Sequence, residues 1–124
     1  MGRFIFKKAE RLSKKKSIQE LFDKGSSFYL YPFKVLHSPN PDPTSEVHQI
    51  LISVSTRTFK KAVDRNLVKR RVREAYRLQK EIIQHKSQKG VFAFIYTAKT
   101  IMTFEDIKDK LFLVLKKIEK LEVL

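Results

Sequence analysis

The side chains best suited to chemistry in this sequence are the basic ones of residues 60–77, KKAVDRNLVKRRVREAYR. Eight of these eighteen residues are Lys or Arg. Four of them recur at every fourth position, so a helix would place them on one side. These four are Arg65, Lys69, Arg73 and Arg77. Like charges in such a row repel each other, and a nucleic-acid backbone relieves that repulsion. The spacing therefore predicts a surface that binds nucleic-acid phosphates.

A second side of the same predicted helix is suited to packing. It consists of Val68, Val72, Ala75, Gln79 and Ile82. The alternative is a solvated charged helix, but such helices usually have acidic partners four residues away. Between residues 57 and 77 the only acids are Asp64 and Glu74, which favours phosphate binding. Asn66 has an amide that either contacts RNA or bonds locally to the backbone, and both roles stay open.

Catalysis by the protein's own side chains has little support in the sequence. The three histidines, His37, His48 and His85, have no metal-binding spacing, and the chain has no cysteine. No glycine-rich phosphate-binding loop is present, and no acidic pair stands near the basic face. We therefore expect no catalytic residue and no metal site in the protein, and a nuclease with its own active site is disfavoured.

Residues 28–37, FYLYPFKVLH, are rich in aromatic side chains. Rings of this kind stack on unpaired bases, although each ring alone is more often part of a core. The candidates are Phe28, Tyr29, Tyr31 and Phe33. A groove between a first helix and this strand could admit a single strand of nucleic acid, although plain helix-on-sheet packing explains the same residues.

The whole chain has 124 residues, 42% of them hydrophobic, and a net charge of +14 with a pI near 10.1. Such a chain is expected to form one domain over residues 1–124, with a basic, flexible N-terminus over residues 1–12. The excess of positive charge concerns partners rather than fold. No apolar stretch has the length of a membrane span, and the first residues do not resemble a signal peptide. The expected location is the cytoplasm.

The periodicity predicts the element order αββαβα. A first helix is capped by Ser13 or Ser17 and ends at Gly25, and strands follow over 28–37 and 47–55. Pro32 marks an edge or a bulge, and residues 38–46 form a long hairpin connection. The basic helix spans about 60–86, a central strand spans 91–97, and a last helix begins at the capping pattern of residues 103–106. This order predicts an α/β (α+β) two-layer sandwich, with helices packed on a small mixed sheet and the basic helix in a crossover connection.

The pattern Ala62-Val63-x-Arg65-Asn66-x-x-Lys69-Arg70-x-x-Arg73-Glu74-Ala75-Tyr76-Arg77 resembles the signature of the protein subunit of bacterial ribonuclease P. The resemblance extends back through Ser53-Val54-Ser55 to Gly25, to the helix ending at Phe22, and to Arg11-Leu12. It covers about two-thirds of the chain in the same order, and the last third agrees mainly in its elements.

This resemblance implies a partner RNA that is itself the catalyst. The complex would remove the 5′ leader of precursor tRNA by hydrolysis, with Mg²⁺ bound mainly by the RNA. The protein would be an accessory subunit that helps to bind the leader and the metal ions. We expect a monomer in a 1:1 complex with ribonuclease P RNA, with no obligate protein partner and no membrane.

The resemblance also assigns residues to two surfaces. The catalytic-RNA-binding residues would be Arg65, Asn66, Lys69, Arg70, Arg73, Arg77, Lys60 and Lys61. The leader-binding cleft would comprise Ile18, Phe22, Phe33, Leu36, Ser53 and Arg57. The sequence departs from the family pattern in the loop over residues 56–61, which is one residue longer and has no glycine. It also has Ile18 and Leu36 where relatives often have aromatic residues, so leader affinity is expected to be lower or differently tuned.

Three other functions compete with this interpretation. A general or ribosomal RNA-binding protein fits the charge and size equally well, but it does not account for the signature. A nuclease with its own active site would cleave RNA without the help of a catalytic RNA. A DNA-binding helix-turn-helix is disfavoured because no short turn joins two helices. On the leading interpretation, replacing Arg65 or Arg70 with Ala weakens RNA binding and leaves the fold intact.

Overall fold

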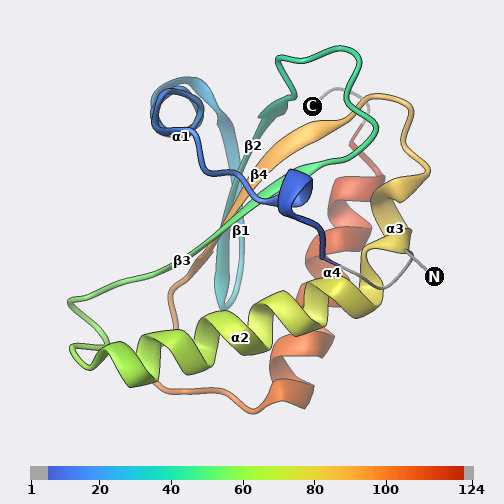
Figure 1. Ribbon diagram of the computed structural model, residues 1–124. Coiled ribbons are helices and arrows are strands. Elements are labelled where there is room, and N and C mark those ends of the chain that lie inside the picture. The colour runs from blue at the N-terminus through green and yellow to red at the C-terminus, as the bar shows by residue number, and fades with distance from the viewer. Residues whose placement is uncertain (1–5, 122–124) are drawn as a thin grey trace.

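The computed structural model describes residues 6–121, and it contains a four-stranded sheet with helices on both faces (Figure 1). The strands are β1 (Ser26–Leu30), β2 (Phe33–Pro39), β3 (Gln49–Val54) and β4 (Gly90–Tyr96). The helices are η2 (Lys8–Glu10, a 3-10 turn), α1 (Lys15–Lys24), α2 (Ala62–Gln79), α3 (Glu81–Gln84) and α4 (Phe104–Glu119). In the part of the chain that is described, no helix is both long enough and apolar enough to cross a membrane.

The sheet is mixed, with the strand order β1-β2-β4-β3. β4 pairs antiparallel with β2 and parallel with β3, so α2 lies in a crossover between two neighbouring parallel strands. The predicted fold class, a mixed sheet with the basic helix in a crossover, is therefore confirmed. β2 and β3 are not paired with each other, so the prediction that residues 38–46 form a hairpin connection was wrong. Residues 38 and 39 end β2, and residues 40–48 form a long loop that leads to β3 at the far edge of the sheet.

The predicted strand over residues 28–37 is instead a hairpin. Tyr31 and Pro32 form its turn, joined by a cis peptide bond, and β1 and β2 pair from Leu30–Phe33 to Ser26–His37. The sheet therefore has one strand more than the predicted order. The turn was not predicted, because residues 28–37 are rich in β-forming residues and Pro32 is the one typical turn residue among them.

Strand alternation divides the sheet into two packed faces. The larger core lies under α2 and α4 and includes Phe33, Val35, Phe92 and Phe94, all fully buried. The smaller core lies under α1 and comprises Leu12, Leu21, Leu36, Val91 and Ala93. In Figure 1, α1 is on one side of the sheet and α2 and α4 are on the other. The larger core holds the basic helix against the sheet.

The helix ends differ partly from the predicted ones. α1 begins after Lys14 without a side-chain cap, whereas it ends at Gly25 as predicted. A Cβ at Gly25 would come within 2.4 Å of the Leu21 carbonyl oxygen, so this close turn requires glycine. The predicted cap of the last helix is confirmed, because the Thr103 side chain accepts a hydrogen bond from the Asp106 N–H at 3.2 Å. The predicted basic helix is divided, since α2 ends at Gln79 and the short α3 follows.

The segment before α1 is packed in a defined position from residue 6 onward. The Leu12 N–H donates to the Ile50 carbonyl at 2.9 Å, and Arg11 forms a parallel bridge with Ile50. Flexibility was expected over residues 1–12. Residues 1–5 lie outside the described part, whereas residues 6–12 run along the outer edge of β3.

Candidate nucleic-acid interface

The basic surface is built on α2, whose packed side follows the predicted spacing. Val68, Val72 and Ala75 are fully buried in the larger core, and Gln79 donates to the Lys108 carbonyl at 3.1 Å. Because this side of α2 is packed against the core, the opposite side faces solvent. The Asn66, Arg70 and Arg73 side chains are exposed there, and Lys69 is half-buried. Lys60 and Lys61 are exposed immediately before the helix.

Two arginines of this segment are held by backbone carbonyls. Arg65 Nη1 donates to the carbonyls of Phe59 and Lys60 at 2.8 and 2.9 Å, so it closes the loop that precedes α2. Arg71 Nη1 donates to the Met102 carbonyl at 2.7 Å, on the side where α4 begins. Arg65 therefore has a structural contact in addition to its predicted role, which modifies the expectation that its loss leaves the fold intact.

Arg77, at the end of the row, forms an intrahelical ion pair with Glu74. Arg77 Nε donates to Glu74 Oε2 at 3.0 Å. This hydrogen bond lowers the pKa of the Glu74 carboxyl and raises the pKa of the Arg77 guanidinium. Part of the Arg77 charge is thus offset within the helix by Glu74, and the densest positive charge, over residues 69–73, lies near the middle of α2.

Three of the residues predicted to line the leader cleft lie together on the α1 face of the sheet. Leu36 belongs to the smaller core, and Ile18 packs against that core. Ser53 stands opposite Ile95, which packs against the same cluster. Phe22 follows Ile18 by one turn of α1 and is 48% exposed, so its ring is available to a ligand. Arg57 is exposed in the turn after β3.

Phe33 does not belong to this cleft, and its assignment there was wrong. Its side chain is fully buried in the larger core, with its ring 6.4 Å from that of Phe94. Because strand side chains alternate, Phe33 and Leu36 lie on opposite faces of β2, and Lys34 lies on the cleft face instead. The sequence did not settle which face each aromatic residue occupies, because the turn at residues 31–32 was not recognised.

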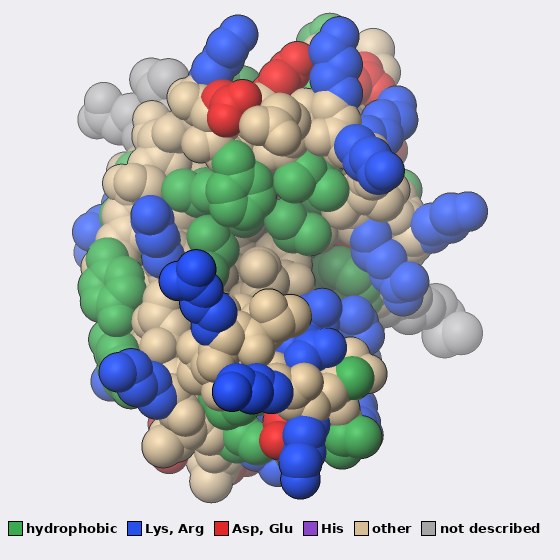
Figure 2. Space-filling view, turned by 90° about the vertical axis from the view of Figure 1, so that its left-hand side faces the viewer, with side chains coloured by type: hydrophobic (Ala, Val, Ile, Leu, Met, Phe, Trp, Pro, Cys, Tyr) green, Lys and Arg blue, Asp and Glu red, His purple; other side chains and the backbone are tan. Residues whose placement is uncertain are grey.

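The surface around the α1 face combines apolar and basic side chains. Figure 2 shows hydrophobic side chains gathered in the upper half of this side of the molecule, with Lys and Arg side chains beside and below them. Sequence reasoning missed several residues of this face: Lys34, which is exposed, and Leu51 and Ile95, which are half-buried. The alternation of β3 and β4 was the available signal, because Leu51, Ser53 and Ile95 occupy one face in register.

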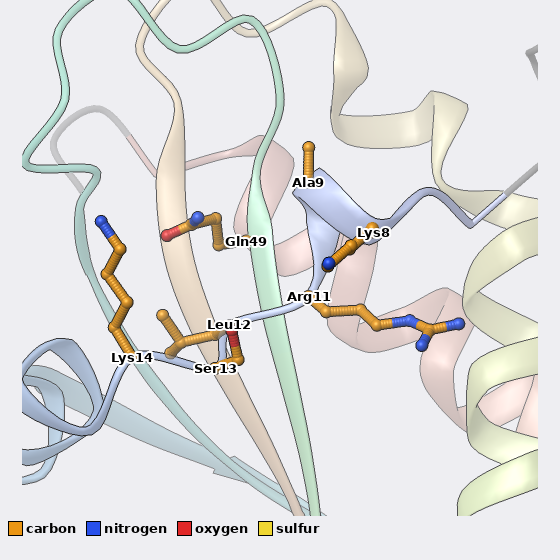
Figure 3. A pocket seen from close by; sticks show the side chains of 7 residues that line it. All are labelled: Lys8, Ala9, Arg11, Leu12, Ser13, Lys14 and Gln49. Carbon is orange, nitrogen blue, oxygen red and sulfur yellow. The ribbon is translucent and has the colours of Figure 1, made fainter.

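Two depressions lie along the segment that precedes α1, and the smaller one also borders α2. The larger, of about 470 Å³, is lined by Lys8, Ala9, Arg11, Leu12, Ser13, Lys14 and Gln49 (Figure 3). The smaller, of about 240 Å³, is lined by Phe6, Arg11, Leu12, Ser13, Ile50, Leu51, Ile52, Lys69 and Arg73. Three residues of the N-terminal segment line both depressions, namely Arg11, Leu12 and Ser13. The sequence did not indicate the smaller depression, because the N-terminal segment and α2, which both line it, are far apart in the chain.

Fold and surface together define a class, namely a small α+β protein in which a crossover helix presents a basic face suited to polyanions. Comparison with known proteins identifies the family within this class. Residues 6–119 match the family model of ribonuclease P. The ribonuclease P protein component of Porphyromonas gingivalis (strain ATCC 33277) is 32% identical over 109 residues, covering 85% of this chain and 80% of that protein. The ribonuclease P protein component of Petrotoga mobilis is 40% identical over 75 residues, or 60% of each chain.

Solved structures agree with the sequence comparison. The RNase P protein of Staphylococcus aureus superimposes with a TM-score of 0.73 at 29% identity, covering 91% of this chain and 97% of that one. The RNase P protein of Thermotoga maritima gives a TM-score of 0.72 at 27% identity, covering 87% and 96%. The chain belongs to the ribonuclease P protein family, the accessory protein subunits of the enzyme that matures tRNA 5′ ends.

Proposed function

We propose that this chain binds the catalytic RNA of ribonuclease P and the single-stranded 5′ leader of precursor tRNA. In this proposal the RNA performs the magnesium-dependent hydrolysis that removes the leader. The protein holds the RNA near its active centre and holds the leader in the cleft on the α1 face.

The observation that supports RNA binding best is the exposed row on α2. Asn66, Arg70 and Arg73 project from a helix whose other side is fixed in the core. Arginine forks form bidentate contacts with phosphate, and a rigid helix presents them without a further loss of backbone freedom. This arrangement favours an RNA backbone over a small anion, because the exposed polar groups extend over about two turns from Asn66 to Arg73, and the exposed Lys60 and Lys61 precede the helix.

Leader binding is supported by the chemistry of the α1 face. Phe22 offers an exposed ring, Ile18 offers apolar surface, and Ser53 and Lys34 offer polar and charged contacts at the same face. An unpaired strand of variable sequence suits such a surface, because every base has a face for stacking and every nucleotide has a phosphate.

The proposal places the magnesium ions on the RNA. Over the residues that the structure describes, no three His, Asp or Glu side chains gather as a metal-ligand group. The chain would act as a single copy on one RNA in the cytoplasm. Its high net charge opposes self-association without the RNA.

A cleavage assay tests the proposal. A precursor tRNA is incubated at low Mg²⁺ concentration with a bacterial ribonuclease P RNA alone, with this protein alone, and with both. We expect 5′-leader cleavage only when both are present. Cleavage by the protein alone would place an active site in this chain. RNA binding without stimulation of cleavage would favour a general RNA-binding protein.

A further inference from the structure

An exposed tyrosine ring lies on the α1 face, outside the residues assigned to the leader cleft. Strand pairing places four residues opposite one another in turn across the whole sheet, namely Tyr29, Lys34, Ile95 and Ser53. Residues paired across strands share a face of the sheet, so these four side chains form one row, which we call the open row. The open row connects Ser53, a residue of the predicted cleft, with Tyr29 at the opposite edge of the sheet.

The next row of the same face is covered by α1, whereas the open row is not. That covered row consists of Ser27, Leu36, Ala93 and Leu51. Leu36 and Ala93 are 7% and 0% exposed, because they belong to the smaller core under α1. In the open row the two residues on β1 and β2 are exposed, and the two on β4 and β3 are half-buried. Figure 1 shows α1 beside the start of β1, with the hairpin turn at the other end of the strand. The open row is therefore the accessible part of this face.

The side chain of Tyr29 is held in a fixed position on the sheet. Its hydroxyl lies 3.1 Å from Thr97 Oγ1. Thr97 Oγ1 donates its one hydrogen to the Pro32 carbonyl at 2.8 Å, so the Tyr29 hydroxyl is the donor to Thr97. Thr97 follows β4, and β2 separates β4 from β1, so the side chain extends across β2 along the surface of the sheet. It remains 56% exposed, so a ligand can reach the ring without first ordering it.

We propose that the Tyr29 ring stacks on a base of the 5′ leader, an inference that rests on the proposed function. An unpaired nucleotide has a base that stacks on a ring and a phosphate that binds a cation, and Tyr29 and Lys34 supply these from directly paired positions. The ring lies on the α1 face, whereas α2 and its basic residues lie on the other side of the sheet (Figure 1). This placement favours the leader over the catalytic RNA as the source of the base.

The open row also gives the leader a path across the strands. Ser53 is on β3 and Tyr29 is on β1, the two edge strands, and three strand spacings separate them by about 14 Å. β3 leads into α2, the helix proposed to lie near the active centre of the RNA. The leader therefore passes Ser53 first, and Tyr29 meets a nucleotide that is farther from the cleavage site.

The test removes the ring in Tyr29→Leu and keeps it in Tyr29→Phe. Phe112→Leu is the matched control, because Phe112 is a 40% exposed ring on α4, on the other side of the sheet. Each protein is assembled with ribonuclease P RNA. Equilibrium affinity is measured for mature tRNA and for precursors with a non-cleavable linkage, whose leaders lengthen one nucleotide at a time. Thermal unfolding checks that every variant is folded.

We expect Tyr29→Leu to bind long-leader precursors about tenfold more weakly than wild type, as the loss of one base–ring stack predicts. Its affinity for mature tRNA and for the shortest leaders should be unchanged. Tyr29→Phe should stay within about threefold of wild type, because it loses only the hydrogen bond to Thr97. The control should bind every substrate as wild type does.

A second measurement identifies the stacked base. An abasic nucleotide is placed at each position of the leader in turn, and affinity is compared between wild type and Tyr29→Leu. At one position the abasic nucleotide should weaken binding to wild type and have no further effect on Tyr29→Leu, because ring and base act as a pair.

Wild-type affinity of Tyr29→Leu for every leader would overturn the inference, and so would an equal loss for mature tRNA or in the Phe112→Leu control. An abasic scan without a position at which the two losses overlap would overturn it as well. If the wild-type complex binds precursors no more tightly than mature tRNA, leader binding itself, as part of the proposed function, is refuted instead.

Discussion

At the scale of single residues, substitution of Arg70 is expected to affect RNA affinity alone, whereas substitution of Arg65 should also affect stability. Arg70 is exposed on α2, so Arg70→Ala is expected to weaken binding of ribonuclease P RNA by about 1–3 kcal/mol, the range for a charge-assisted hydrogen bond. Its unfolding free energy should stay within about 0.5 kcal/mol of wild type. Filter binding and urea unfolding measure the two quantities.

Arg65→Ala serves as the contrasting variant, because Arg65 bonds the Phe59 and Lys60 carbonyls. We expect it to lower stability by about 1–3 kcal/mol as well as RNA affinity, since the loop carbonyls lose a charged partner. A destabilised Arg70→Ala variant, or an Arg65→Ala variant of unchanged stability, would contradict these contacts.

His48 is expected to make the stability of the protein depend on pH. Its Nε2 donates to the Ile83 carbonyl at 2.8 Å, and its Nδ1 accepts the Gly90 N–H at 2.9 Å, so the neutral ring is fully bonded. Burial lowers the pKa of His48 below the ordinary 6.5, and the charges of Lys89 and Lys86 lower it further. As pH falls below about 6.5, the unfolded chain takes up a proton that the folded chain does not. The unfolding free energy should therefore decrease.

The measurement is urea unfolding of wild type and His48→Gln between pH 7.5 and 5.5. The variant should lose this part of the pH dependence, whatever its stability at neutral pH. The same slope in His48→Gln as in wild type would assign the effect to other groups.

At the scale of elements, the N-terminal segment and the end of α2 form one unit through Glu10 and Lys80. Glu10→Gln leaves a buried ammonium group without its counter-charge, so we expect a loss of about 3–5 kcal/mol in unfolding free energy. Glu10→Leu/Lys80→Met removes both charges and should recover most of this loss. Denaturant unfolding of the three proteins tests the coupling. A single variant as stable as wild type would show that the pair does not hold the segment.

The elements also show which sequence patterns were informative. The packed side of α2 was predictable, because Val68, Val72 and Ala75 recur at helical spacing. Apolar side chains at that spacing form one stripe that is buried in the core. The hairpin at residues 31–32 was not predictable in the same way, because β1 and β2 have similar compositions. Missing that turn reversed the face assigned to Phe33.

At the scale of the whole molecule, the net charge of +14 should make RNA binding strongly dependent on salt. If about six cations of the α2 surface neutralise phosphates, affinity falls roughly a thousandfold between 50 and 200 mM salt. Titration of ribonuclease P RNA at several salt concentrations measures the slope. A flat response would show that phosphate contacts contribute little to binding.

The sequence by itself determined the family, the basic row on one helix and the α/β class, because these depend on residue types at local spacings. The tertiary structure alone decided which face of the sheet each aromatic residue occupies, that Arg71 bonds to the distant Met102 carbonyl, and that Glu10 reaches Lys80. It also placed Arg11 of the N-terminal segment in one depression with Lys69 and Arg73 of α2. These pairings depend on strand order and register, which bring together residues far apart in the chain and have no signature in local periodicity.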